Sequence, residues 1–231
     1  MSLDDVRLKN IASGIFARRG LVLKEANFTS FKEMNFRWTL RGNVATLKVS
    51  DYLDDAPDDV LEEFLKGAIT YIAGGRHVFG KRYMEYMTSD EFILRKRPVY
   101  YKRSRRLLRS DIGDHRNLLD AVQRLVEKGL LNESDIQNTL FTWTADPTFT
   151  RLGYCSQMFR IVVISRVFDS PAVPEELFDY VVYHECMHLR QGYRPFNHRP
   201  HDAEFRRNMA LYPDGDKLEE RLKDIPKLYR K

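Results

Sequence analysis

The pattern of hydrophobic and polar positions changes its period within the first third of the chain. Apolar and polar residues alternate through MNFRWTLRGNVATLKVS, and Arg41-Gly42-Asn43 in its middle is a favourable turn sequence. Alternation places successive side chains on opposite faces of a strand, so a β-hairpin is predicted over about 34–49. Apolar residues then recur at helical spacing between Pro57 and Gly74-Gly75, which predicts a helix.

The rest of the chain predicts more helices around two short strands. One helical pattern ends at Gly129, and a longer one begins at Pro174 and ends near Gly192. Between them, IQNTLFTWT and MFRIVVIS have the composition of strands and are separated by the turn-rich ADPTFTRLGYCS. Further helices are expected from Asp202 and in DGDKLEERLKDIP. A hairpin, helices, a small sheet and a second run of helices indicate an α+β fold.

Length and composition indicate a globular, cytoplasmic protein. With 231 residues, 43 % hydrophobic and 31 % charged, the chain is neither disordered nor fibrous, and one domain is favoured over two. Within it we expect a hairpin-helix region over 1–135, with an insertion at about 75–112, and a second region over 136–231 that carries the histidine-rich stretch. No stretch is long and apolar enough for a membrane, and MSLDDVRLKNIASG lacks the apolar core of a secretory signal. Two cysteines cannot build a disulfide framework, which fits a reducing compartment.

The positive charge is concentrated in one segment. The net charge is +5, yet residues 95–109 hold eight Lys and Arg and no Asp or Glu, which leaves 30 basic against 33 acidic residues elsewhere. Cations in such a run can contact phosphates, and Tyr100-Tyr101 can stack on exposed bases. The segment therefore indicates DNA as a partner, and a solvated charged surface is the alternative interpretation.

The chemistry of the chain centres on His184-Glu185-Cys186-Met187-His188, a His-Glu-x-x-His pattern inside the longest predicted helix. Residues i and i+4 lie on one helix face a turn apart, so both imidazoles can reach one ion. Glu185 stands beside the first ligand and can hold an activated water without being a ligand itself. With three protein ligands, a zinc ion keeps a fourth position open for that water, so the pattern predicts a catalytic zinc site.

The third ligand must come from beyond this helix. The elongated pattern, with Gly three and His six positions after the second histidine, is excluded because Gln191 and Arg194 occupy those places. Glu204 could serve in the manner of the glutamate-ligand class, and His198 lies in the intervening loop. We favour His201, because it directly precedes a residue that can cap a new helix and would therefore be held rigidly.

Other polar groups near the pattern have less specific signals. The oxyanion of a tetrahedral intermediate needs a donor besides the metal, and the candidates by sequence proximity are Tyr193, Arg194, His198 and Arg199. Both cysteines, Cys155 and Cys186, are interpreted as packing residues, although Cys155 could approach the site from the turn before the second strand.

Residues 151–205 resemble the SprT-like zinc metallopeptidases and the related bacterial and archaeal metal-dependent hydrolases. The shared pattern is Arg-x-Gly-x-Cys/Ser, a strand, a helix with an acidic start that carries His-Glu-x-x-His, and then His-Gly-x-x-Phe. The resemblance implies a zincin-like fold, zinc ligation by His184, His188 and His201, and Glu185 as catalytic acid/base. Asp202 replaces the usual Gly, and the cysteine zinc ribbon common in the family is missing.

The resemblance further implies a zinc-dependent peptidase that hydrolyses a polypeptide substrate, and suggests proteins associated with DNA. In that architecture an edge strand lines the cleft and pairs with extended substrate, a role that we assign to 158–164. Two other functions stay open: a zinc-dependent hydrolase of a non-protein substrate, and a nucleic-acid-binding protein with a non-catalytic zinc. Glu185 argues against the last, because a structural site needs no base.

Overall fold

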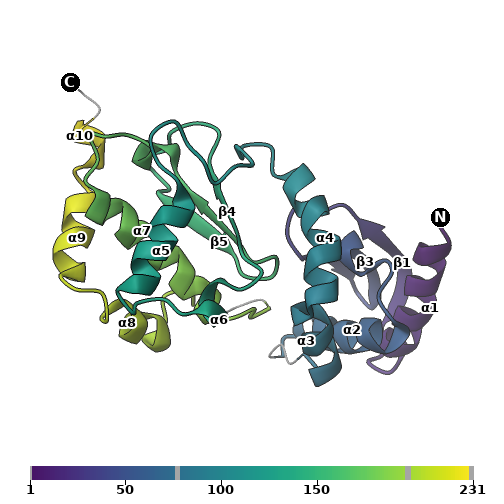
Figure 1. The fold of residues 1–231 in the computed structure, drawn as a ribbon. Coiled ribbons are helices and arrows are strands. Elements are labelled where there is room, and N and C mark those ends of the chain that lie inside the picture. Colours follow the sequence, from purple (N-terminus) through teal and green to yellow (C-terminus); the bar gives the residue numbers. More distant parts are fainter. Residues whose placement is uncertain (1, 76–78, 196–198, 229–231) are drawn as a thin grey trace. The chain divides into compact units, whose positions relative to one another are not determined.

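The computed structural model describes residues 2–75, 79–195 and 199–228, and the chain divides into two compact units, Met1–Arg103 and Ser104–Lys231. Each unit combines helices with a mixed three-stranded sheet (Figure 1), as expected for an α+β protein. We expected one domain with two regions divided at residue 135. The division into compact units instead falls after Arg103.

The N-terminal unit builds its sheet around the last of three strands. In chain order its elements are α1 (Leu3–Ala17), β1 (Val22–Thr29), β2 (Phe36–Arg41), β3 (Val44–Ser50), the 3-10 turn η1 (Asp51–Leu53), α2 (Asp58–Ile72), α3 (Lys81–Thr88) and α4 (Asp90–Arg103). The central strand β3 pairs antiparallel with β2 and parallel with β1. The predicted hairpin is confirmed, because β2 and β3 are joined through Gly42-Asn43 with Gly42 at φ +58°.

Two elements of this unit escaped the sequence pattern. Helix α1 was not predicted, and β1 was missed because its register shifts between Leu23 and Glu25, which breaks the alternation of exposed and buried side chains. Helix α2 is confirmed: acidic residues occupy its first turn after Pro57, and Gly74 follows it in the left-handed region at φ +80°.

The segment predicted as an insertion contains two helices of the N-terminal unit. Helix α3 packs against α2 and against α4, and α4 includes most of the basic run. Phe92 and Tyr100 are buried on α4, so this helix contributes to the core of the unit. Pro98 lies inside α4 with its side chain exposed. The segment is therefore part of the unit's helical layer.

The C-terminal unit again places its last strand in the middle of the sheet. Its elements are α5 (Leu118–Glu127), α6 (Glu133–Ile136), β4 (Leu140–Trp143), β5 (Gly153–Ser156), β6 (Ile161–Ile164), the 3-10 turn η2 (Arg166–Phe168), α7 (Glu175–Arg190), α8 (Ala203–Met209), α9 (Gly215–Leu222) and α10 (Ile225–Leu228). Strand β6 pairs parallel with β4 and antiparallel with β5. The predicted strands correspond to β4 and β6, whereas β5 lies in the segment predicted as turns.

Helix α7 lies at the centre of this unit. It contacts α5, α6, α8 and α9 as well as β5 and β6. Phe178 stacks on the fully buried Trp143 with ring centroids 5.5 Å apart, and burial of each such side chain contributes about 2–3 kcal/mol. At the other end, Arg190 forms an ion pair with buried Asp135 and donates to the carbonyl of Leu130. The core and this ion pair fix the helix on which the predicted ligands lie.

Over the described ranges, no helix is both long enough and apolar enough to span a bilayer.

Candidate metal centre

Three histidine side chains converge beside α7. His184 and His188 lie one turn apart on the helix, and His201 stands just before α8. One ring nitrogen from each lies within 4.8 Å of the other two, and Nε2 of His188 is 3.2 Å from Nε2 of His201. These three side chains are therefore close enough to hold a metal ion. The favoured candidate of the sequence pattern, His201, is the third member of this group.

The other candidates for third ligand behave differently. The Glu204 carboxylate forms an ion pair with Arg194 and does not belong to the histidine group. His198 lies outside the described residues. Asp202 caps α8 by accepting a hydrogen bond from the backbone N–H of Phe205, as its place in the sequence predicted. This cap fixes the start of the helix directly after His201.

Phe205 forms an apolar base beneath the three imidazoles. Its ring centroid lies 4.4 Å from that of His188, 4.6 Å from that of His201 and 4.9 Å from that of His184. Its side chain is buried. Tight packing on one side limits the rotamers of the three rings, which pre-organises them for a common ligand. Sequence proximity alone did not single out this contact, although Phe205 lies in the motif that carries the family resemblance.

The residues that rule out the elongated motif form a hydrogen-bond network around His188. Nδ1 of His188 lies 3.2 Å from Oε1 of Gln191, and the Gln191 amide donates to Asp202. Arg194 forms ion pairs with Asp202 and Glu204. The backbone hydrogen bond from Phe205, together with Arg194 and Gln191, lowers the pKa of Asp202 to about 2. A Gln191 oxygen that accepts from Nδ1–H leaves Nε2 of His188 as the metal-binding atom.

Burial controls the protonation of the two groups at the centre of the site. It lowers the pKa of His184 to about 3, and the neighbouring His188 and His201 act in the same direction. The His184 ring is therefore neutral at physiological pH, as a metal ligand must be. The Glu185 side chain is only 5 % exposed, and burial raises its pKa to about 8, although Arg151 opposes the shift.

Strand β5 passes so close to Glu185 that a side chain larger than glycine at position 153 would displace the carboxylate. A Cβ atom on Gly153 would lie 2.7 Å from Oε1 of Glu185. A cavity of about 380 Å³ opens here, lined by β5, by Glu185 and by the three histidines. Gln157, at the end of β5, donates to the backbone carbonyl of His188 at 2.7 Å. The end of β5 is thus hydrogen-bonded to α7, and the cavity between them extends to the Glu185 side chain.

The strand that lines this cavity is not the one that the sequence indicated. Strand β6, within the predicted 158–164, is central and pairs on both sides, so the expectation that it forms an edge is wrong. Strand β5 is an edge strand, and residues of β5 line the cavity. The sequence did not predict β5 for two reasons. The residues around it have the composition of turns, and four residues are too few to show an alternating pattern.

The two cysteines and the arginines near the histidine group differ in burial and in contacts. Cys186 is fully buried, and burial raises the pKa of its thiol, which supports a packing role. Cys155 is partly exposed and lines the cavity. Arg194 is engaged by two carboxylates, so it is a poor oxyanion donor. Arg151, the first residue of the Arg-x-Gly-x-Cys pattern, lines the cavity with its guanidinium 4.2 Å from the Tyr154 ring centroid.

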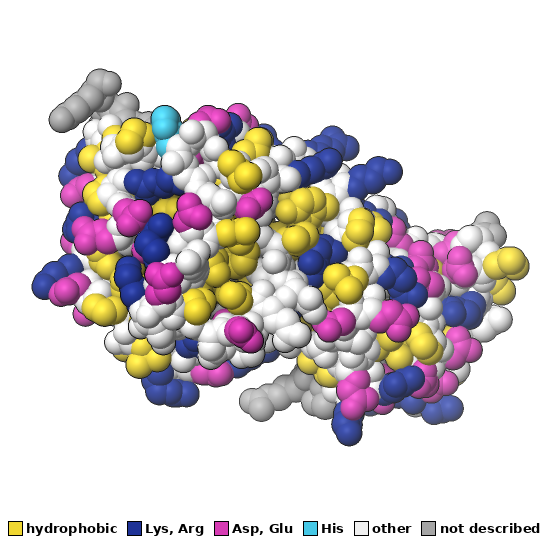
Figure 2. Space-filling model, viewed as in Figure 1, with side chains coloured by type: hydrophobic (Ala, Val, Ile, Leu, Met, Phe, Trp, Pro, Cys, Tyr) yellow, Lys and Arg dark blue, Asp and Glu magenta, His cyan; other side chains and the backbone are white. Residues whose placement is uncertain are grey.

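The basic segment 95–109 is partly neutralised within the N-terminal unit. Lys96 is nearly buried and contacts both Asp54 and Asp55 at 2.9 Å. Arg103 forms a two-pronged ion pair with Asp51. Figure 2 shows positive and negative side chains interspersed over the visible face of this unit. Several cations of the run therefore stabilise the fold instead of forming a continuous positive surface.

Bases were expected to stack on Tyr100 and Tyr101, and for Tyr100 this expectation is wrong. Tyr100 is fully buried, so its ring offers no exposed face. Arg105, Arg106 and Arg109 are exposed. These exposed cations fit a solvated charged surface and a nucleic-acid contact equally, so DNA binding by this segment stays a prediction.

Comparison with known proteins gives no further assignment. No protein-family model matches the chain, and a search of curated proteins found no significant match.

Proposed function

We propose that the protein is a zinc-dependent metallopeptidase of the SprT-like, zincin-like kind. The observation that carries the proposal is the convergence of three histidine nitrogens beside a buried glutamate, at a cavity lined by an edge strand. The order of the motifs over residues 151–205 supports the same assignment. The proposal concerns the C-terminal unit alone.

The donor set fits zinc. His184, His188 and His201 would hold the ion, and three neutral imidazoles with an open fourth position are a common arrangement of catalytic zinc. The low pKa of His184 keeps that ligand unprotonated. When bound, zinc supplies Lewis-acid chemistry, which polarises a carbonyl and acidifies water.

Glu185 performs the proton transfers. Its carboxylate takes a proton from the attacking water and delivers it to the nitrogen of the leaving amine. Its neighbours suit this role: Gly153 leaves room for the carboxylate, and burial brings its pKa to about 8, close to neutral pH. Arg151 is the cation nearest to Glu185 in the cavity lining, and it could stabilise negative charge that develops on the substrate.

Substrate binds as an extended segment along β5. An edge strand offers unpaired backbone N–H and C=O groups, and a polypeptide satisfies them by adding a strand. This backbone pairing favours a polypeptide over a non-protein substrate. The DNA-associated subset of substrates has no corresponding support in the contacts of 95–109.

The test compares the wild-type chain with Glu185→Gln. Metal content should be unchanged in the variant, while cleavage of unfolded casein should fall by about 10²- to 10⁴-fold, because the general base is lost. His188→Ala should lose both the metal and the cleavage. Metal analysis and gel-based cleavage assays give the two readouts. Undiminished cleavage by Glu185→Gln would overturn the mechanism, and a wild-type chain with zinc but no peptide cleavage would favour a non-protein substrate.

A further inference from the structure

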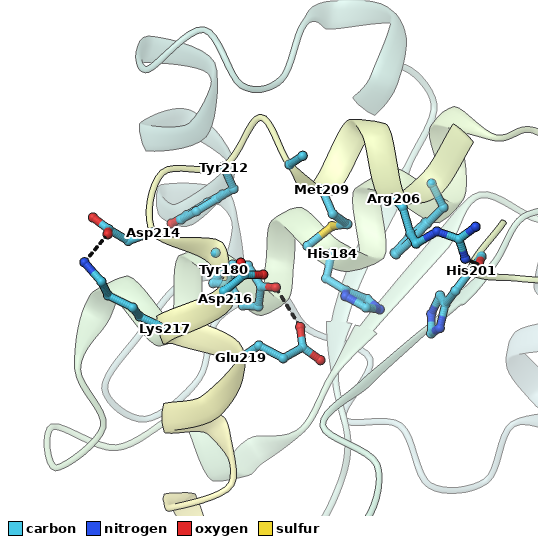
Figure 3. Close-up of a pocket in the computed structure, with 13 residues that line it drawn as sticks. Tyr180, His184, His201, Arg206, Met209, Tyr212, Asp214, Asp216, Lys217 and Glu219 are labelled. Atoms are coloured by element: carbon cyan, nitrogen blue, oxygen red, sulfur yellow. Dashed lines mark hydrogen bonds and ion pairs between the residues drawn. The ribbon is translucent and has the colours of Figure 1, made fainter. Parts of the chain in front are cut away.

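A second cavity, of about 640 Å³, adjoins the histidine group on the side away from β5. His184 and His201 line this cavity as well as the first one, so the candidate metal centre lies between the two. Figure 3 shows the second cavity running from these histidines past Met209 to the start of α9. A substrate that crosses the metal centre along β5 would present a side chain here.

The near part of this cavity is apolar. Phe205 and Met209 of α8 line it, as does the ring of Tyr180 from α7. Gly215 leaves the far part open, since a Cβ there would make only ordinary contacts, with the Tyr180 ring at 3.6 Å and the Met209 carbonyl oxygen at 3.8 Å. Aromatic and thioether walls suit the methylene stem of a long side chain.

The far part of the cavity is acidic. Glu219 accepts a hydrogen bond from the Tyr180 hydroxyl at 2.7 Å, and Figure 3 shows this pair facing the same space as His184. Within the described part of the chain, Asp216 forms no hydrogen bond or ion pair. Asp214, in contrast, is neutralised by Lys217 at 2.5 Å. Among the described residues, neither Glu219 nor Asp216 forms a salt bridge, although the charge of Lys223 acts on Glu219 at longer range. Two carboxylates therefore lie at the end of an apolar passage.

The cavity lining also contains Arg206, whose guanidinium is hydrogen-bonded elsewhere. Arg206 donates to the backbone carbonyl of His201 at 2.9 Å, at the end of the cavity nearest the metal centre. Burial raises the pKa of Tyr180, and the hydrogen bond to Glu219 and the charges of Glu219 and Asp216 raise it further. The Tyr180 hydroxyl therefore remains a donor. Tyr180 thereby holds one oxygen of Glu219 and leaves the other for a ligand.

We propose that this cavity is the subsite that selects the substrate, and that it binds a lysine or arginine side chain next to the cleaved bond. The proposal rests on the peptidase function proposed above and specifies its substrate class. The stem of the side chain packs on Met209 and Phe205, and its cationic head reaches Glu219 and Asp216. Because both carboxylates are exposed, each contributes only modestly, about fivefold in affinity.

The first experiment measures binding without catalysis. Nα-acetyl-arginine methylamide is titrated into the zinc-loaded chain, with Nα-acetyl-norleucine methylamide as the uncharged probe, and the methyl signal of Met209 is followed by NMR. The arginine probe should shift this signal and bind at least fivefold more tightly than the norleucine probe. In Glu219→Gln the difference should disappear. Glu220→Gln is the matched control, because Glu220 lies on the same helix, pairs with Lys223 and does not line the cavity.

The second experiment measures selection during cleavage. Fragments of an unfolded protein are mapped by mass spectrometry, and basic residues should be enriched at one fixed position relative to the cleaved bond. The enrichment should fall about fivefold in Glu219→Gln and persist in Glu220→Gln. Arginine binding at the cavity without any cleavage would overturn the peptidase function and leave the cation site standing. Cleavage with no basic preference, together with equal binding of the two probes, would overturn the subsite and leave the peptidase function standing.

Discussion

The two units of the chain build the same arrangement of strands but place different side chains in it. In both, the first strand pairs parallel and the second antiparallel with the third, which is central. In both, a 3-10 turn follows the third strand, and a helix then starts after Pro57 or Pro174 with two acidic residues in its first turn. A helix from before the sheet packs against this one in each unit: α1 on α2, and α5 on α7.

The common arrangement gives a residue-level correspondence. Ser50 and Ser165 are both buried and both stand at the N-cap position of a 3-10 turn, although only the Ser165 side chain accepts a capping hydrogen bond there. Val49 precedes Ser50 and pairs with Phe36 of β2. Ile164 precedes Ser165 and pairs with Gly153 of β5. Fourteen positions after the helix-capping proline stands Tyr71 in α2, and His188 in α7. The N-terminal unit therefore has aromatic residues where the C-terminal unit has glycine and histidine.

The difference shows that side chains, and not the arrangement of elements, decide where chemistry is available. Phe36 lies edge-on to Tyr71 and stacks on Trp38 at 5.4 Å, which fills the space between the second strand and the helix. In the C-terminal unit Gly153 leaves that space to Glu185 and a cavity. One scaffold thus carries an apolar cluster in one unit and a candidate metal centre in the other.

The largest expected effect is on metal content, when His188 of α7 and its counterpart in α2, Tyr71, are each replaced by alanine. His188→Ala should abolish metal binding, because two imidazoles do not complete the site. Tyr71→Ala should keep the full metal content and lower only the stability of the N-terminal unit. Metal analysis after gel filtration distinguishes the two. Loss of metal in Tyr71→Ala would show that the units are not independent in this respect.

A large effect on stability is expected at the second strand of the N-terminal unit. Phe36→Ala should lower the free energy of unfolding of this unit by about 3 kcal/mol, because Phe36 is 4 % exposed and its loss leaves a cavity. Denaturant titration measures the change. Leu40→Ala, at an exposed position of the same strand, is the control and should cost less than about 1 kcal/mol. Similar costs for both variants would contradict the packing assigned to the aromatic cluster.

Gly153→Ala tests the corresponding position in the C-terminal unit. The added Cβ would lie 2.7 Å from Oε1 of Glu185, so the carboxylate must move. We expect peptide cleavage to fall by about ten- to a hundredfold with metal content unchanged, because displacement of a catalytic group is costly. Gly14→Ala is the control, since no atom lies within 4 Å of its Cβ. Full activity of Gly153→Ala would mean that Glu185 tolerates displacement.

The smallest effect concerns acid stability of the C-terminal unit. Burial opposes ionisation of Asp135, but hydrogen bonds from Arg190 and from the Asn132 backbone outweigh it and lower its pKa below 3.8. The stabilisation is therefore complete above pH 3.8 and is lost as the pH falls through the lowered value. Asp135→Asn should flatten the dependence of stability on pH below about 4, as measured by urea unfolding at several pH values. An unchanged slope would contradict the ion pair.

Several features followed from the sequence because they depend on neighbours along the chain. The hairpin at Gly42-Asn43 needs a local turn, and α2 and α7 need helical periodicity with an acidic start. His184, His188 and Glu185 share one helix, so their spacing alone brings the first two to one face. The cap at Asp202 is also a local feature, and it favours His201 as the third histidine of the group.

Other features needed the tertiary structure because they join residues that are distant in sequence. Strand β5 is too short to have a pattern of its own, and only its pairing with β6 makes it the edge beside Glu185. The run 95–109 was basic in sequence, but Lys96 and Arg103 within it pair with aspartates more than forty residues earlier. The sequence by itself predicted the helix that carries His184, Glu185 and His188, and it favoured His201 as the third member of the histidine group. The fold alone decided which strand, cavities and counter-charges surround them, since packing and electrostatics act through space and not along the chain.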